Sequence, residues 1–175
     1  LVPFPWGSPL SEVENLGDIA WYTRQISIPR DWEGKRIFMV VGASDWLTKG
    51  WIDGQALGEY QGGYTPFEFE LTDHVNFCTS QEIILKVDDS PHEFKLFGKQ
   101  GYGDAKGIWQ TIYLEARPEN FIQNFYFTPD IDHDLLHVRV VIDKELSTDA
   151  EIKLNYIGED TEYAIGETNS AAGNR

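Results

Sequence analysis

The chain has 175 residues, of which 41% are hydrophobic and 14% aromatic, enough for the core of one domain or slightly more. Its formal net charge of −15 argues against nucleic acid, which needs clustered Lys and Arg, and against anionic membranes. No apolar run approaches the roughly 20 residues of a membrane span. The single cysteine, Cys78, rules out an intrachain disulfide and is expected to be a buried or inert thiol. A chain with one cysteine is compatible with the cytoplasm and also with export.

The acidic residues are unevenly distributed along the chain. Residues 1–117 carry 17 acidic and 10 basic side chains (net −7), whereas residues 118–175 carry 12 and 4 (net −8) in half the length. All six tryptophans precede Pro118. The composition therefore predicts a boundary near Pro118, with one domain over residues 1–117 and another over 118–175.

Before this boundary, nearly every periodic segment alternates with period two, which is typical of strands with one buried face. We expect five strands, over Trp21–Ile28, Ile37–Val41, Phe67–Leu71, Glu82–Val87 and Ile108–Leu114. The continuous apolar run Ile37–Val41 predicts a strand buried on both faces. Asp53-Gly54 predicts a two-residue hairpin, because both residues tolerate positive φ.

The β pattern continues after Pro118. We expect four strands, over residues 121–128, 135–143, 151–157 and 162–166. Asp130, Asp132 and Asp134 resemble the start of a calcium loop, but Leu135 and Val141 stand where such a loop needs Gly and Glu. We therefore expect a polar hairpin turn and no metal site. Short strands with turns at this spacing indicate an all-β sandwich or barrel.

Several phrases spaced along residues 1–128 carry a resemblance to a known family. They are Trp21-Tyr-Thr-Arg, Trp51-Ile-Asp-Gly, Gly62-Gly-Tyr-Thr-Pro-Phe and Gly107-Ile-Trp-Gln. In order and spacing they resemble the N-terminal sugar-binding domain of family 2 glycoside hydrolases, the β-galactosidase, β-glucuronidase and β-mannosidase group. We interpret these residues mainly as core aromatics and turn glycines.

The resemblance implies a fold and a function. It implies a jelly-roll (galactose-binding-like) β-sandwich over residues 1–117, followed by the first part of an immunoglobulin-like sandwich that is cut off within 118–175. The chain would be the non-catalytic N-terminal region of a β-galactosidase-like hydrolase of O-glycosyl bonds. Its partners would be carbohydrate and a C-terminal catalytic barrel, which needs about 250 residues and cannot fit here. No cofactor is implied, and no catalytic residue is expected in this chain.

The resemblance also points to a loop that could shape the rim of the sugar pocket. Polar side chains there could hydrogen-bond sugar hydroxyls, and exposed aromatic rings could stack on pyranose faces. The candidate substrate-binding residues are Trp46, Lys99, Gln100, Tyr102 and Asp104. Some family members carry an acidic residue seven positions before the Ile of the last phrase, where this chain has Gly101.

Two other functions are compatible with the sequence. The domain could be an autonomous carbohydrate-binding module, which exposed Trp46 or Tyr102 would favour. It could also be a scaffold for packing between subunits of a homo-oligomer, which a large exposed apolar patch would favour.

Overall fold

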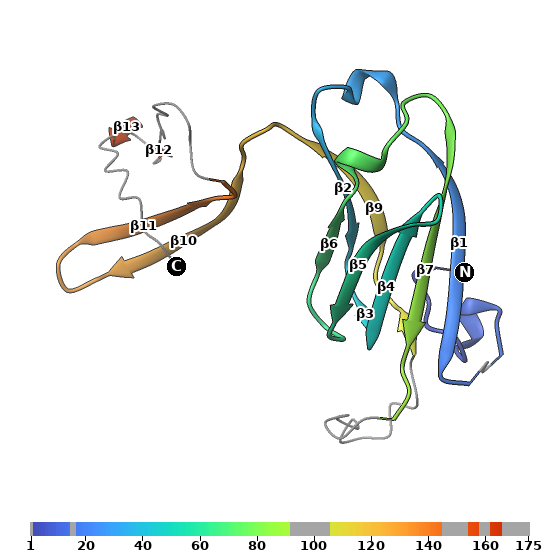
Figure 1. Ribbon diagram of the computed structural model, residues 1–175. Helices are drawn as coiled ribbons and strands as arrows, with labels where there is room; N and C mark the ends of the chain where they lie inside the picture. Colours follow the sequence, from blue (N-terminus) through green and yellow to red (C-terminus); the bar gives the residue numbers. More distant parts are fainter. Residues whose placement is uncertain (1, 15–16, 92–105, 145–153, 158–161, 166–175) are drawn as a thin grey trace. The chain divides into compact units, whose positions relative to one another are not determined.

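The computed structural model describes residues 2–14, 17–91, 106–144, 154–157 and 162–165 (Figure 1). The chain forms two compact units, Leu1–Glu119 and Asn120–Arg175, called unit 1 and unit 2. Over the described ranges it is all-β, as predicted, and its helices are short 3-10 turns. These turns are η1 (Pro9–Ser11), η2 (Arg30–Trp32) and η3 (Thr72–His74).

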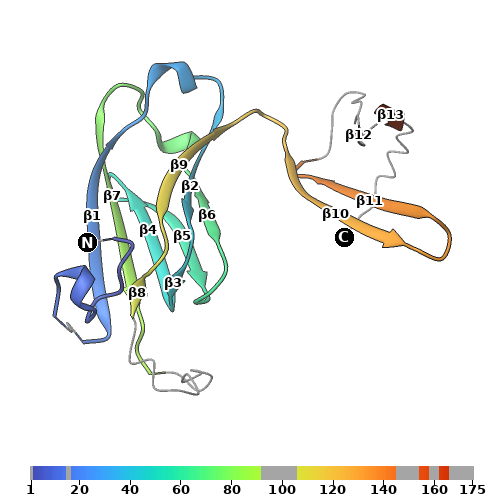
Figure 2. The ribbon, with the colours of Figure 1, turned by 180° about the vertical axis from the view of Figure 1, so that it is seen from behind.

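Unit 1 is a sandwich of two antiparallel sheets, which form the two layers seen in Figures 1 and 2. The four-stranded sheet has the order β1-β7-β4-β5 and the three-stranded sheet the order β6-β2-β9. The strands of the first sheet are β1 (Ile19–Ser27), β7 (Ser80–Asp88), β4 (Leu47–Ile52) and β5 (Gln55–Gln61). The second sheet contains β6 (Phe67–Glu70), β2 (Arg36–Val41) and β9 (Ile112–Arg117), and a short pair joins β3 (Ser44–Asp45) to β8 (Gly107–Ile108). Neighbouring strands that are distant in sequence are typical of the jelly roll that the sequence predicts.

The core lies between the two sheets and follows the predicted alternation. On β6, Phe67 and Phe69 are buried while the glutamates between and after them are exposed. On β7, Ile83, Leu85 and Val87 are buried, also as predicted. Since burial of each such side chain contributes about 1.5–3 kcal/mol, this alternation specifies the register of both sheets.

The central strand β2 is buried on both faces, as its apolar run predicts. Its inner face contributes Ile37, Met39 and Val41 to the core. On the outer face, the guanidinium groups of Arg36 and Arg117 lie 5.0 and 4.3 Å from the centroid of the Phe38 ring. Two arginines thus cover an aromatic ring that would otherwise face water.

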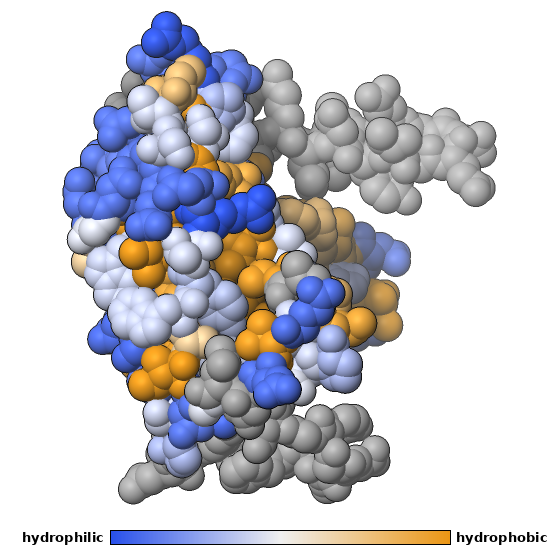
Figure 3. Space-filling model, turned by 90° about the vertical axis from the view of Figure 1, so that its right-hand side faces the viewer, coloured by the Kyte–Doolittle hydropathy of each residue, from blue (hydrophilic) through white to orange (hydrophobic). Residues whose placement is uncertain are grey.

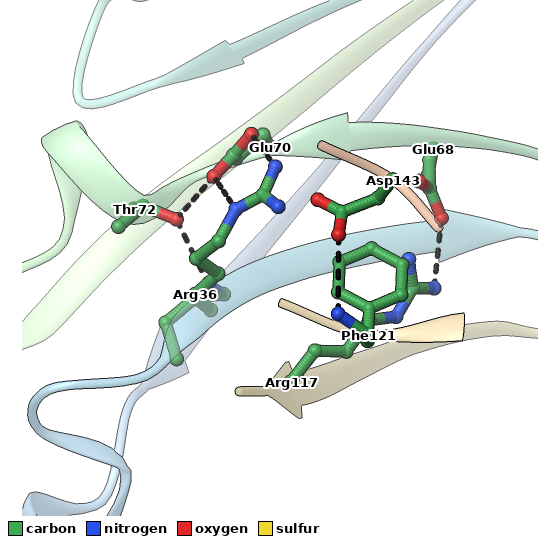
Figure 4. Close-up of polar contacts among 8 residues, drawn as sticks. Arg36, Glu68, Glu70, Thr72, Arg117, Phe121 and Asp143 are labelled. Atoms are coloured by element: carbon green, nitrogen blue, oxygen red, sulfur yellow. Dashed lines mark hydrogen bonds and ion pairs between the residues drawn. The ribbon is translucent and has the colours of Figure 1, made fainter. Parts of the chain in front are cut away.

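Carboxylates on β6 and β9 neutralise the two arginines (Figure 4). Arg36 donates two hydrogen bonds of 2.8 Å to Glu70, and Arg117 lies 2.8 Å from Glu68 and 3.1 Å from Glu115. Burial lowers the pKa of Arg117, but the hydrogen bonds to both glutamates outweigh it and raise the pKa above its usual value. Arg117 therefore stays charged at any pH at which the protein is folded.

The predicted strand Ile108–Leu114 is wrong as a single element. β8 ends at Ile108 and β9 begins at Ile112. Between them, the amides of Trp109 and Gln110 both donate to the Ala43 carbonyl, at 3.2 and 3.4 Å. At this point the backbone stops pairing with β3 and begins to pair with β2. The strand is therefore interrupted, although its side chains continue to alternate.

The hairpin predicted at Asp53-Gly54 is present, with φ values of 47° and 80°. The Asp53 carboxylate accepts hydrogen bonds of 2.8 Å from the Glu82 amide and from Gln81 Nε2. These bonds, the backbone one first, lower the pKa of Asp53. The turn residue thus ties the β4–β5 hairpin to the start of β7.

Two facing glycines make a slot in the four-stranded sheet. Gly50 on β4 pairs with Gly58 on β5. A Cβ at Gly50 would lie 3.2 Å from the ring of Phe69, and one at Gly58 would lie 4.0 Å from it. The ring of Phe69 from the opposite sheet therefore crowds a side chain at position 50, whereas at position 58 the φ of 127° is what favours glycine.

Unit 2 contains two antiparallel hairpins in its described part. They pair β10 (Ile122–Asp130) with β11 (Leu135–Ile142), and β12 (Leu154–Ile157) with β13 (Glu162–Ile165). The predicted polar turn connects β10 to β11: Asp130 Oδ1 accepts from the Asp132 and His133 amides, both at 3.2 Å. Asp143 accepts from the Phe121 amide at 3.1 Å, which closes the other end of this hairpin (Figure 4).

The structure corrects several expectations about exposure. Trp21 and Tyr64, interpreted as core aromatics, are 62% and 76% exposed. Trp21 lies on the outer face of an edge strand, and Tyr64 lies in the connection between β5 and β6. Trp46, expected to be exposed, is half-buried. Cys78 is exposed rather than buried, because it lies in a turn where its φ is 60°.

Candidate functional site

The segment that the sequence predicts as a pocket-rim loop is held at both flanks by one residue, Asp18. The Asp89 amide donates to the Asp18 carbonyl at 2.7 Å, just after β7 ends. On the other flank, Lys106 Nζ donates to Asp18 Oδ1 at 2.7 Å. The side chain of Lys106 is only 10% exposed, whereas that of Asp18 is 43% exposed, so water reaches this ion pair from the carboxylate side. Asp89 and Lys106, which flank residues 90–105, are therefore both bonded to Asp18.

Gly107 lies next to this flank in a tightly packed place. Its φ is 84°, and a Cβ there would meet the Trp6 ring and the Tyr22 hydroxyl well inside 3.0 Å. Trp6 is 3% exposed, and its Nε1 donates to the Gly17 carbonyl at 3.1 Å. Burial raises the pKa of Tyr22, although the hydrogen bond that its oxygen accepts from the Ile108 amide opposes this. Position 107 thus requires glycine for two reasons: its φ is positive, and a side chain would collide with Trp6 and Tyr22.

Beyond Gly107, three aromatic residues lie close to the end of the sandwich where β3 pairs with β8. Figures 1 and 2 show where this end lies. We call Trp46, Tyr64 and Trp109 the aromatic end. The Tyr64 and Trp109 rings meet edge to face, with centroids 5.8 Å apart and planes at 64°. Trp109 Nε1 donates to the Gly63 carbonyl at 2.8 Å, and the Gly62 amide donates to the Trp46 carbonyl at 3.0 Å. These bonds hold three separate chain segments together.

Close packing around Gly63 positions the aromatic end. A Cβ at Gly63 would lie 2.8 Å from Asp45 Oδ1, so no larger residue fits without moving that carboxylate. The peptide bond between Asp45 and Trp46 is cis. The Tyr64 ring is exposed and packs edge to face with Trp109, and the Asp45 carboxylate lies beside Gly63.

The group that the aromatic end exposes most is the Tyr64 ring. An exposed aromatic ring supplies a flat apolar surface, and the tyrosine hydroxyl supplies a hydrogen-bonding group. Among the residues that the structure places, no group of three or more His, Cys, Asp or Glu side chains could hold a metal ion. Nor does that part of the chain contain a helix with the length and apolarity needed to cross a membrane.

Of the five predicted site residues, the structure places one. Trp46 lies at the aromatic end, half-buried and next to Asp45. Lys99, Gln100, Tyr102 and Asp104 lie outside the described residues. Sequence reasoning assigned Tyr64 and Trp109 to the core. The signal that could have found them is their position in two glycine-containing phrases, because such glycines often accompany irregular, functional backbone.

Taken together, the two-layer jelly roll and its aromatic end define a β-sandwich of the carbohydrate-binding type. Residues 2–118 match the family model "Glycosyl hydrolases family 2, sugar binding domain". This match covers more than half of the chain, and the chain therefore belongs to family 2 of the glycosyl hydrolases, as its sugar-binding domain.

Individual relatives agree with this assignment. A β-galactosidase of Thermoanaerobacter pseudethanolicus is 25% identical over 67% of this chain and 16% of its own length. A β-glucuronidase of Paenibacillus borealis is 30% identical over 90% of this chain and 30% of its own length. Among solved structures, a β-glucuronidase of an uncultured Clostridium species matches 97% of this chain with a TM-score of 0.74 at 18% identity, which shows the common fold. The chain spans less than a third of the length of each of these proteins.

Proposed function

We propose that this chain is the non-catalytic N-terminal region of a larger retaining glycoside hydrolase that acts on β-linked sugars. The observation that supports the proposal is the family match over residues 2–118 in a chain that spans at most 31% of these relatives. The relatives are named as β-galactosidases and β-glucuronidases, which favours a hydrolase over an autonomous binding module. In this proposal a catalytic barrel outside the chain supplies the two carboxylates of double displacement.

We further propose that residues 1–117 form a jelly-roll domain and that residues 118–175 belong to the first part of an immunoglobulin-like sandwich. Two strands rarely make a stable sheet alone, and a complete sandwich of this type has about seven. The β10–β11 hairpin exposes large apolar side chains, which supports the proposal that it packs within a larger sandwich. These side chains are Ile122, Phe125, Tyr126, Phe127, Leu135 and Leu136.

The role proposed for the aromatic end is to shape the mouth of the sugar pocket beside the barrel. Tyr64 is 76% exposed, and the Trp109 ring beside it is fixed by the hydrogen bond that its Nε1 donates to the Gly63 carbonyl. A rigid support under an exposed ring pre-organises that ring for stacking on a pyranose face. The predicted loop residues Lys99, Gln100, Tyr102 and Asp104 would add hydrogen bonds to hydroxyl groups.

Two measurements test this function. The isolated chain is expected not to hydrolyse p-nitrophenyl β-galactoside or β-glucuronide, and turnover by the pure chain would contradict the proposal. In the full-length parent, Tyr64→Ala is expected to raise KM several-fold with little change in melting temperature. Tyr113→Ala, an exposed tyrosine on β9, serves as the matched control. Equal KM values for the two variants would show that the aromatic end does not contribute to the sugar pocket.

A further inference from the structure

A second aromatic surface lies on the four-stranded sheet, on the face turned away from the core. Trp21 on β1 and Trp51 on β4 come from the two strands that flank β7. In the register of the sheet, Trp21 is opposite Lys86 and Trp51 is opposite Ile84. The two indoles reach across β7 and stack, with ring centroids 5.6 Å apart and planes at 28°.

Packing of the core does not explain this pair. Neither tryptophan belongs to the buried cluster of unit 1 or to the side chains packed against it. Trp21 is 62% exposed, so one face of its ring is open. A large exposed aromatic surface is unfavourable in water, and such surfaces commonly mark binding sites.

The polar residues around the pair carry charges that neutralise one another. Lys49 lies 2.8 Å from Glu59, and Lys86 lies 3.4 Å from Asp88. Each lysine of this face is thus paired with a carboxylate. The surface offers no surplus positive charge for a phosphate, a uronate or an anionic lipid, and the chain's net charge of −15 opposes them further.

The same face is rich in hydrogen-bonding groups. Besides the charged pairs, Thr23 donates to Glu82 at 3.0 Å. The charged and polar side chains next to the two tryptophans therefore interrupt the apolar surface of this face. Figure 3 views the molecule from the right-hand side of Figure 1, and there too apolar residues are interspersed with hydrophilic ones. A protein partner of the obligate type would need a continuous apolar patch. A flat aromatic ring beside paired donors and acceptors instead fits a neutral sugar ring, which has an apolar C–H face and hydroxyls at its edge.

We propose that Trp21 and Trp51 form a binding surface for neutral hexopyranose units of a β-linked glycan. One sugar ring stacks on the open face of Trp21, while Trp51 supports that indole from behind. The polar side chains on β4 and β7 hydrogen-bond the hydroxyls. The surface would hold a polysaccharide against the enzyme, and this inference is independent of which residues shape the catalytic pocket.

The test is affinity electrophoresis of the 175-residue chain in native gels that contain soluble β-glucan, β-galactan or polygalacturonate. We expect retardation by at least one neutral glycan and none by polygalacturonate. Trp21→Ala and Trp51→Ala should each weaken binding about tenfold. Trp21→Tyr should keep most of it. Tyr113→Ala, which removes an exposed ring from the other sheet, should leave binding unchanged.

Three results would overturn the inference. The first is no retardation of the unaltered chain by either neutral glycan. The second is retardation that Trp21→Ala and Tyr113→Ala reduce equally. The third is a dimer in sedimentation velocity that Trp21→Ala converts to a monomer, because this face would then be an interface between copies. Failure of the proposed hydrolase function would appear separately, in the activity and KM measurements on the parent.

Discussion

Replacement of Gly107 by alanine is expected to destabilise unit 1 more than the same change at Gly54 or Gly34, two glycines with a similar positive φ. At φ 84° a residue with a Cβ loses roughly 1–2 kcal/mol relative to glycine. The added methyl group would also overlap the Trp6 ring and the Tyr22 hydroxyl. Because Trp6 is 3% exposed, its ring cannot move aside without disturbing the core, and overpacking of this kind costs about 1–3 kcal/mol.

The expected total loss is therefore roughly 2–5 kcal/mol, a large part of the stability of a typical domain. Gly54 and Gly34 provide matched controls, since their φ values are 80° and 82° and no atom lies within 4 Å of a Cβ placed at either. Gly54→Ala and Gly34→Ala should lose only the backbone part, about 1–2 kcal/mol.

Urea unfolding of the three variants, followed by far-UV circular dichroism, measures these differences. The variants should show similar m-values, with the midpoint of Gly107→Ala clearly below the two midpoints of the controls. If Gly107→Ala and Gly54→Ala agree within about 0.5 kcal/mol, the close packing of Trp6 over Gly107 does not constrain this turn, and the reasoning fails.

Three further changes test other contacts. Trp109→Phe removes the hydrogen bond to the Gly63 carbonyl and should cost about 1 kcal/mol in urea unfolding; an unchanged midpoint would contradict this role. Arg117→Met keeps the aliphatic cover of Phe38 but loses the charge, and should cost about 1–2 kcal/mol, less at 1 M NaCl; a salt-independent loss would argue against it. The pKa of Asp53 is lowered in the folded state, so its contribution is present above the unfolded pKa of about 3.9 and is lost as pH falls through the folded pKa. The difference in melting temperature between the native chain and Asp53→Asn should therefore shrink below pH about 4, and a constant difference would refute the linkage.

Much of unit 1 could be predicted because its strands obey a local rule. Phe67 and Phe69 alternate with glutamates, and a period of two is visible in four residues. The Asp53-Gly54 turn could be predicted for a similar reason, since the φ values it needs are a property of the two residues themselves. The break after Ile108 could not, because it arises from bonds to Ala43, which lies 65 positions earlier.

The exposure of particular aromatics could not be predicted either. In β1, alternation separates Trp21 from Tyr22, but it does not say which of the two faces the core. That choice depends on β7 and β4, which pair much later in the chain. Likewise, the contact between Trp6 and Gly107 joins residues at opposite ends of unit 1, and no local pattern records it.

The slot formed by Gly50 and Gly58 has a consequence for how this domain can change during evolution. A Cβ at Gly50 would lie only 3.2 Å from the Phe69 ring, so positions 50 and 69 constrain each other. Gly58 is constrained by its own φ of 127°, which residues with a Cβ rarely adopt, and not by the ring. In related domains a side chain at position 50 should therefore occur together with a smaller residue at position 69, whereas position 58 should remain glycine whichever residue stands at position 69.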